Sequence, residues 1–174
     1  MKKKDIWISV AIVVASALVF YFYTQREGYV QIDAGGADAI LTLRSGLLSN
    51  ATISSREEPS ALSARAHNPR FLSISMKQDG QTWQIESRGP WADLSKIRIK
   101  GNQTTTLRLG PPFLIEPSVS RSSSSVSIDF AVIGQAGEQY QKFVTRDNRT
   151  VADAKATIVD EAGNVLATGK FRYG

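Results

Sequence analysis

Hydrophobic and polar residues alternate along most of this chain with a period of two, which is the pattern of β-strands. The clearest example is residues 71–87, FLSISMKQDGQTWQIES. A two-residue turn at Asp79–Gly80 predicts a hairpin in which Met76 faces Trp83. This register places apolar side chains on one face and polar side chains on the other at every pair. We therefore expect Trp83 to pack in the core.

The same alternation continues to the last residue of the sequence. Residues 165–174, VLATGKFRYG, follow a short apolar run at 156–159 and a turn that contains Gly163. This order predicts a second hairpin. Phe171 and Tyr173 belong to its apolar face, so we expect both side chains to pack inward.

Further strands are predicted at residues 29–33, 39–44, 113–119, 126–133 and 138–145. The first two flank a glycine turn at 34–36, which favours a hairpin. A three-residue loop at 101–103 predicts another hairpin, in which Ile97 pairs with Leu107. The polar stretch 49–70 contains two prolines and is interpreted mostly as loop. Short strands at intervals of about ten residues are typical of a β-sandwich or barrel, so the predicted fold class is all-β with an antiparallel sandwich.

The first residues of the chain follow a different pattern. Residues 6–23 form a run of eighteen residues without a charge, and three lysines precede it. This length and these flanks predict a single-pass transmembrane helix in the plasma (inner) membrane, with a cytoplasmic N-terminus. The C-terminal part is then periplasmic or extracellular. A cleaved signal peptide is the alternative, but small residues at cleavage spacing do not follow the apolar run.

Two consecutive prolines divide the remaining residues. Pro111–Pro112 cannot lie in a central strand and marks a turn, a bend between sheets or a domain boundary. The predicted organisation is a cytoplasmic tip and anchor at 1–27, followed by a β-sandwich module at 28–110. Residues 111–174 form a second sandwich module or the second half of the same sandwich.

Two segments carry a resemblance to known modules. RIKGNQTTTLRLG, residues 98–110, resembles the closing strands of carboxypeptidase-regulatory-like and prealbumin-like modules. ATIVDEAGNVLATGKFRYG, residues 156–174, is similar to the last hairpin of immunoglobulin-like modules in bacterial surface proteins. The resemblance implies a sandwich that serves as a spacer, adaptor or binding module without catalysis, and it assigns no functional residue.

Composition argues against several kinds of function. The chain has no cysteine and one histidine, which leaves no ligand cluster for zinc. Its net charge is +5, of which residues 1–26 contribute +3, because Lys2–Lys4 and Arg26 oppose only Asp5. The basic residues that follow are mixed with acidic ones, so nucleic-acid binding is not expected.

Few side chains are candidates for chemistry. His67 falls in the polar stretch, and we expect an exposed loop residue without a catalytic role, whose replacement by alanine leaves stability almost unchanged. Asp33 and Asp38 could bind a cation weakly, but a hairpin turn explains them as well. Asp160–Glu161 is more simply a solvated loop than a Ca²⁺ site. We therefore predict no catalytic residue, no cofactor and no metal.

Trp91 is the one candidate ligand contact. It follows a proline in a predicted loop, SRGPWADL, where it either caps the core or offers an aromatic surface to a glycan or peptide. The favoured function is a non-catalytic, membrane-tethered module that binds or positions an envelope partner. The alternative is an accessory subunit or small hydrolase with an acidic site.

Overall fold

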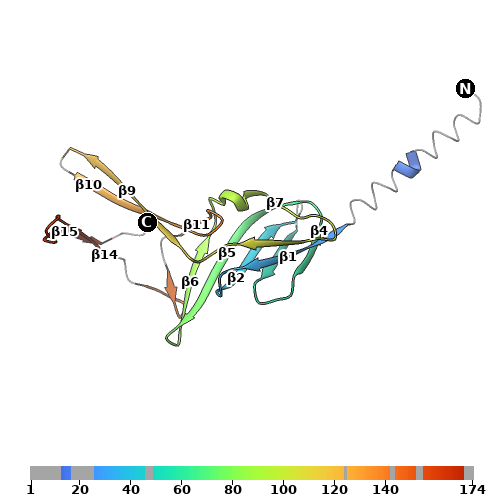
Figure 1. The fold of residues 1–174 in the computed structure, drawn as a ribbon, viewed down its shortest axis with the longest axis horizontal. Helices are drawn as coiled ribbons and strands as arrows, with labels where there is room; N and C mark the ends of the chain where they lie inside the picture. Colours follow the sequence, from blue (N-terminus) through green and yellow to red (C-terminus); the bar gives the residue numbers. More distant parts are fainter. Residues whose placement is uncertain are drawn as a thin grey trace, which may run out of the picture.

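A computed structural model describes most of the chain after residue 25. The described residues are 13–16, 26–45, 49–123, 125–141, 144–151 and 155–170. They are mostly β-strands arranged in several sheets, with antiparallel pairing predominant (Figure 1). The predicted all-β class is therefore confirmed.

Fifteen strands and one short 3₁₀ helix follow one another along this part of the chain. They are β1 (Glu27–Asp33), β2 (Asp38–Arg44), β3 (Asn50–Ser54), β4 (Ser60–Ser63), β5 (Ala66–Gln78), β6 (Gln81–Ser87), the 3₁₀ helix η1 (Ala92–Lys96), β7 (Ile97–Arg98), β8 (Thr104–Arg108), β9 (Leu114–Ser122), β10 (Ser125–Ile133), β11 (Gln139–Tyr140), β12 (Thr145–Arg146), β13 (Arg149–Thr150), β14 (Lys155–Val159) and β15 (Val165–Lys170).

Two sheets enclose the main core. One has the strand order β4-β1-β8, and the other has the order β13-β12-β6-β5-β2-β3 with β7 beside β5. Every second residue of β1 is buried, including Val30 and Ile32, and β2 contributes Leu41 and Leu43 to the same cluster. The strict alternation of these strands thus places one apolar face of each sheet against the other. We call this part of the molecule the sandwich.

The predicted turn at residues 34–36 is present, but it does not form a hairpin. β1 pairs with β4 and β8, whereas β2 pairs with β3 and β5. The chain therefore crosses from one sheet to the other at this turn. Both strands alternate correctly, and alternation alone does not say which strands are neighbours.

The prediction of a loop at residues 49–70 is wrong over most of its length. This stretch contains β3, β4 and the first five residues of β5. Ile53 is buried in the core, and Pro69 lies opposite Leu43 at a register shift of the sheet. The polar composition of the segment reflects its exposed positions, and the few inward positions suffice to hold it.

The predicted hairpin at residues 71–87 is confirmed in its register. Met76 pairs with Trp83 and Ile74 pairs with Ile85, as the sorting of faces requires. The other predicted pairing, Ile97 with Leu107, is wrong. Ile97 pairs with His67 of β5, and β8 runs parallel to β1 in the opposite sheet.

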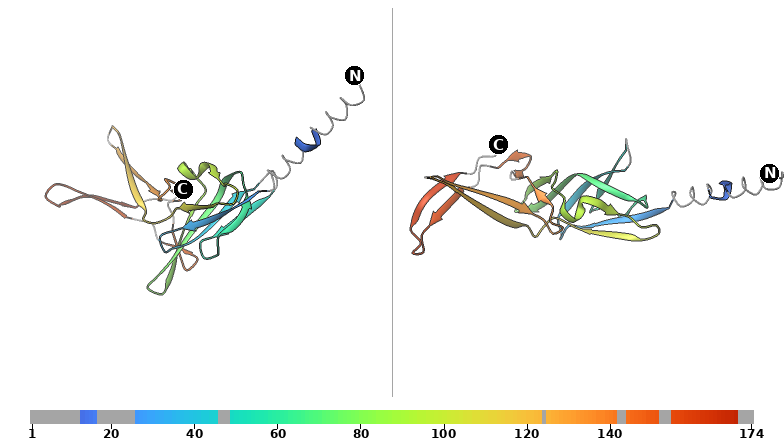
Figure 2. Two further views of the ribbon diagram at one scale, coloured as in Figure 1. Left: turned by 45° about the vertical axis from the view of Figure 1, so that its right-hand side comes forward. Right: turned by 90° about the horizontal axis from the view of Figure 1, so that it is seen from above.

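Two long hairpins project from the sandwich, away from the end at which β1 begins (Figures 1 and 2). β9 and β10 pair from Leu114 to Ile133, and β14 and β15 form a separate two-stranded sheet. All six residues of β15 are exposed. Inward packing of this strand was therefore a wrong expectation for its described residues, whereas Phe171 and Tyr173 lie outside them.

The Pro111–Pro112 break lies between β8 of the sandwich and β9 of the projecting hairpin. The chain later returns, because β12 pairs with β6 at the edge of the larger sheet. The division into modules at 28–110 and 111–174 stays a prediction.

Of residues 6–23, the structure describes 13–16, which are helical, and the others lie outside the described part of the chain. Within the described residues, the structure contains no helix with the length and hydropathy that a membrane span requires.

Candidate functional site

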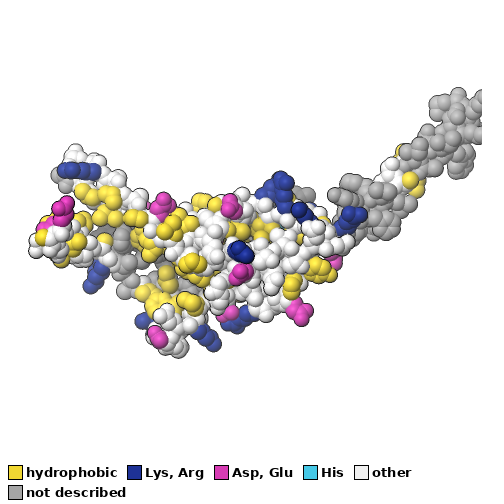
Figure 3. Space-filling model, in the orientation of Figure 1, with side chains coloured by type: hydrophobic (Ala, Val, Ile, Leu, Met, Phe, Trp, Pro, Cys, Tyr) yellow, Lys and Arg dark blue, Asp and Glu magenta, His cyan; other side chains and the backbone are white. Residues whose placement is uncertain are grey.

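An open groove of about 380 Å³ lies where the β5–β6 hairpin meets the base of the β9–β10 hairpin. Its lining includes Ile74, Met76, Trp83, Ile115, Phe130 and Val132. We call it the apolar groove. Hydrophobic side chains also gather over the projecting hairpins on the face shown in Figure 3.

One wall of the groove is the distal part of the β5–β6 hairpin. Met76 is 44% exposed and lies beside its pair Trp83, which is half-buried and not part of the core. The guanidinium of Arg146, on the neighbouring strand β12, lies 5.5 Å from the centre of the Trp83 ring. This cation–π contact and the strand pairing fix the ring at the groove rim. The sequence therefore identified the correct face for Trp83 but overestimated its burial.

The other wall is formed by the start of β9 and the end of β10. Ile115 pairs with Val132, and the Ile115 side chain is 64% exposed while Val132 is buried. Phe113 packs edge-on against Tyr140, with ring centres 5.0 Å apart and planes at 73°. This wall is thus anchored at its base and exposed toward its tip.

A buried carboxylate holds that anchor in place. Glu138 is fully buried, and its Oε1 accepts hydrogen bonds from the Gly110 N–H and the Tyr140 hydroxyl, each at 2.7 Å. Its Oε2 accepts the Ala136 N–H at 2.9 Å. Three donors, two of them from residues beside Glu138 and one from the distant Gly110, thus compensate the burial of this carboxylate. The result is a fixed joint between the end of the sandwich and the β10–β11 loop.

The joint affects its neighbours. Burial, together with the hydrogen bond to Glu138 and its negative charge, raises the pKa of the Tyr140 hydroxyl well above its usual range. A Cβ added at Gly134 would lie 2.1 Å from Oε1 of Glu138, so only glycine fits there. The sequence gives no sign that Glu138 is buried, because it is the first residue of the strand predicted at 138–145, although Gly134 and Gly137 before it mark a tight turn.

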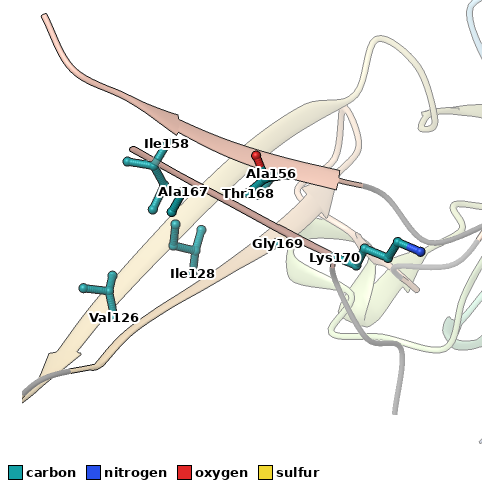
Figure 4. Close-up of a pocket in the computed structure, with 8 residues that line it drawn as sticks. All are labelled: Val126, Ile128, Ala156, Ile158, Ala167, Thr168, Gly169 and Lys170. Atoms are coloured by element: carbon teal, nitrogen blue, oxygen red, sulfur yellow. The ribbon is translucent and has the colours of Figure 1, made fainter. Parts of the chain in front are cut away.

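A second opening, of about 290 Å³, lies between the two projecting hairpins. Val126 and Ile128 of β10 form one side, and Ile158 and Ala167 of the β14–β15 hairpin form the other (Figure 4). Lys170 stands at one end of it (Figure 4). We call this opening the hairpin cleft. Together with the apolar groove, it leaves much of the apolar surface of β9–β10 accessible.

Neither opening has the composition of a catalytic centre. None of the residues that line the apolar groove is titratable, and Lys170 is the one titratable residue among those that line the hairpin cleft. Within the described part of the chain, no three His, Cys, Asp or Glu side chains are grouped as a metal site requires. The arrangement can bind an apolar surface.

The acidic residues singled out from the sequence belong to turns and ion pairs. Asp38 forms a two-pronged ion pair with Arg56, which lowers the pKa of the Asp38 carboxyl. Asp160 accepts hydrogen bonds from the Ala162 and Asn164 N–H groups and thereby stabilises the β14–β15 turn. Turn formation accounts for the position of Asp160.

The expectation that His67 is an exposed loop residue is wrong. It lies in β5 with a fully buried side chain, and its Nε2 is 2.9 Å from the carbonyl oxygen of Ser63. Because a carbonyl only accepts, Nε2 carries the proton. Nδ1 is buried without a hydrogen-bond partner among the described residues. His67 is therefore a structural residue of the sandwich.

Trp91 lies immediately before the helix η1. It is half-buried and packs against the main core, as the first of its two predicted roles requires. It does not line either opening. Contact with a glycan or peptide through its exposed part stays a prediction.

Comparison with known proteins adds no relative. No family model, curated protein or solved structure matches the chain.

Proposed function

We propose that this chain is a non-catalytic β-sandwich protein, tethered to the inner membrane by residues 6–23, that binds an envelope partner outside the cytoplasm. The partner presents an extended apolar segment to the apolar groove. The observation that carries this proposal is the groove itself, an apolar surface left open between a sandwich face and a projecting hairpin.

Exposure of large side chains supports a binding role. Leu114, Ile115 and Val119 of β9 are between 61% and 67% exposed. β9 is also at the edge of its sheet, where an extended segment can add as a further strand. Contiguous exposed apolar surface in a soluble domain marks an interaction site. An apolar segment added along β9 would lie beside these side chains and reach the groove at Ile115.

A hydrolytic activity has less support. It needs carboxylates that converge on a space open to substrate. The buried carboxylate of Glu138 is instead occupied by three donors within the fold. No observation on the described residues favours the accessory hydrolase over a binding module.

The test is site-specific photocrosslinking in intact cells. A photoreactive residue at position 115 lies in the groove, and one at position 40 serves as a matched control, because Ile40 is also exposed but belongs to the sandwich strand β2. We expect a defined adduct from position 115, none from position 40, and loss of the adduct when Met76→Glu is added. Equal adducts from both positions, or none from position 115, would reject the proposal.

A further inference from the structure

Basic side chains from separate segments meet at the end of the sandwich where the chain enters from residue 26. The basic residues are Arg26, Arg44, Arg65, Arg98 and Lys100, accompanied by one acidic residue, Glu27. We call this region the basic end. Four of the five basic side chains are exposed, and Arg44 is half-exposed.

Backbone contacts hold these segments together. The Ala64 N–H donates to the Arg26 carbonyl at 2.7 Å, and the Ile99 N–H donates to the Arg65 carbonyl at 3.0 Å. Arg98 is the pairing partner of Ala66. The Arg65 guanidinium donates to the Ser45 carbonyl, next to Arg44. The positive charges are therefore neighbours in the fold although they are far apart in the sequence.

The charge of the chain is concentrated here. Five basic residues and one acidic residue give the basic end a net charge of +4. Residues 26–174 carry eighteen basic and fifteen acidic residues, a net charge of only +3. The other residues of 26–174 together therefore have a net charge of −1.

The opposite end of the sandwich has a net negative charge. Asp33, Asp38, Glu57 and Glu58 lie there against Arg56, Lys77 and Arg108, where β1 and β8 end and β2 begins. These seven residues have a net charge of −1. The sandwich is thus electrically polarised along its strands.

The basic end is also the end nearest to the predicted anchor. Three residue steps separate Tyr23, the last residue of the uncharged run, from Arg26. A fully extended chain spans about 3.6 Å per residue, so this gap is about 11 Å at most. That distance is close to the Debye length of about 8–10 Å at physiological salt, within which charges attract effectively.

We infer that the basic end docks on anionic phospholipid headgroups of the membrane that holds the anchor. The inference rests on the proposed function, because it takes residues 6–23 as the anchor. Basic clusters next to a membrane segment bind anionic lipid surfaces. Docking in this orientation points the β9–β10 and β14–β15 hairpins away from the bilayer, since they project from the other side of the sandwich (Figures 1 and 2). The apolar groove is then presented to partners rather than to lipid.

The test measures the distance of the basic end from the bilayer in the full-length protein. The chain has no cysteine, so Gln103→Cys gives a single labelling position on an exposed residue at this end. The labelled protein is reconstituted into phosphatidylcholine vesicles with or without phosphatidylglycerol. Energy transfer from the label to acceptor lipids then reports the approach of this end. We expect stronger transfer with phosphatidylglycerol and a return to the lower value at high ionic strength.

Two triple variants distinguish the effect of charge at the basic end from the effect of the total charge of the protein. Arg65→Gln/Arg98→Gln/Lys100→Gln should reduce the ratio of docked to undocked protein at least tenfold. Arg121→Gln/Arg149→Gln/Lys155→Gln removes the same charge from exposed positions outside the sandwich core and should leave that ratio within twofold. Equal effects of the two variants, or transfer that does not depend on phosphatidylglycerol, would overturn the inference.

Flotation after an alkaline wash tests the anchor independently. Full-length protein that floats with vesicles but shows no lipid-dependent transfer retains the tether and contradicts docking. Protein that is washed from the vesicles, yet shows salt-sensitive transfer beforehand, contradicts the tether and supports the basic end as a peripheral lipid-binding surface.

Discussion

The hydroxyl of Tyr140 donates a 2.7 Å hydrogen bond to Oε1 of Glu138, and both side chains are buried. The same oxygen accepts the Gly110 N–H, at the point where the chain leaves the sandwich. This pair therefore links the end of the sandwich to the segment that follows β10. Its contribution can be measured directly.

Glu138→Gln should lower the free energy of unfolding by about 1–3 kcal/mol, because an amide nitrogen replaces one accepting oxygen and leaves a buried donor without a partner. Denaturant unfolding of the full-length protein, followed by tryptophan fluorescence, measures the change. Glu116→Gln is the matched control, since Glu116 is exposed on β9, and its effect should stay within about 0.5 kcal/mol. Similar values for the two variants would contradict the structural role of Glu138.

Tyr140 should make the protein sensitive to alkali. The folded state raises the pKa of its hydroxyl above the ordinary value of about 10, so above that pH the unfolded chain binds fewer protons than the folded one. Stability is then fully present below about pH 10 and falls above it by up to about 1.4 kcal/mol per pH unit. Tyr140→Phe removes this dependence, so the stability gap between wild type and variant should narrow as the pH rises past 10. A gap that stays constant through this range would count against the hydrogen-bonded pair.

Gly134→Ala should destabilise the joint by about 1–3 kcal/mol, because the added methyl group would overlap the Glu138 carboxylate, which three donors hold in place. Gly169→Ala provides the control. Gly169 lies in β15, and no atom lies within 4 Å of a Cβ added there. Its replacement should be neutral or slightly stabilising. Thermal melting followed by circular dichroism distinguishes the two, and equal shifts would argue against the predicted clash.

His67→Ala should cost about 2–5 kcal/mol, since it removes a fully buried ring and its bond to the Ser63 carbonyl. Asn68→Ala, at the next and exposed position of β5, should change stability by less than about 0.5 kcal/mol. Denaturant midpoints of both variants provide the measurement. A neutral effect of His67→Ala would restore the interpretation of this residue as part of a surface loop.

Strand positions and faces followed from the sequence alone wherever alternation was strict. The hairpin at residues 71–87 is the best case, because only one register places Met76 and Trp83 on the same face. Local side-chain periodicity and a two-residue turn are sufficient there. The same reasoning located β1, β2, β10 and β15 within a few residues.

Neighbours across the fold were decided by the tertiary structure. Ile97 pairs with His67 rather than with Leu107, and β1 lies beside β8 in parallel. These pairings bury apolar faces in a common core, and they do not follow from closeness in the sequence. Burial of polar residues was equally invisible in the sequence. Glu138 and His67 lie among polar residues in the sequence. The Gly110 N–H, 28 residues away, joins the two local donors that satisfy the Glu138 carboxylate, and the Ser63 carbonyl accepts the proton of the His67 ring. The basic end has the same origin, since its charges are scattered along the chain and become one surface when the strands that carry them end side by side.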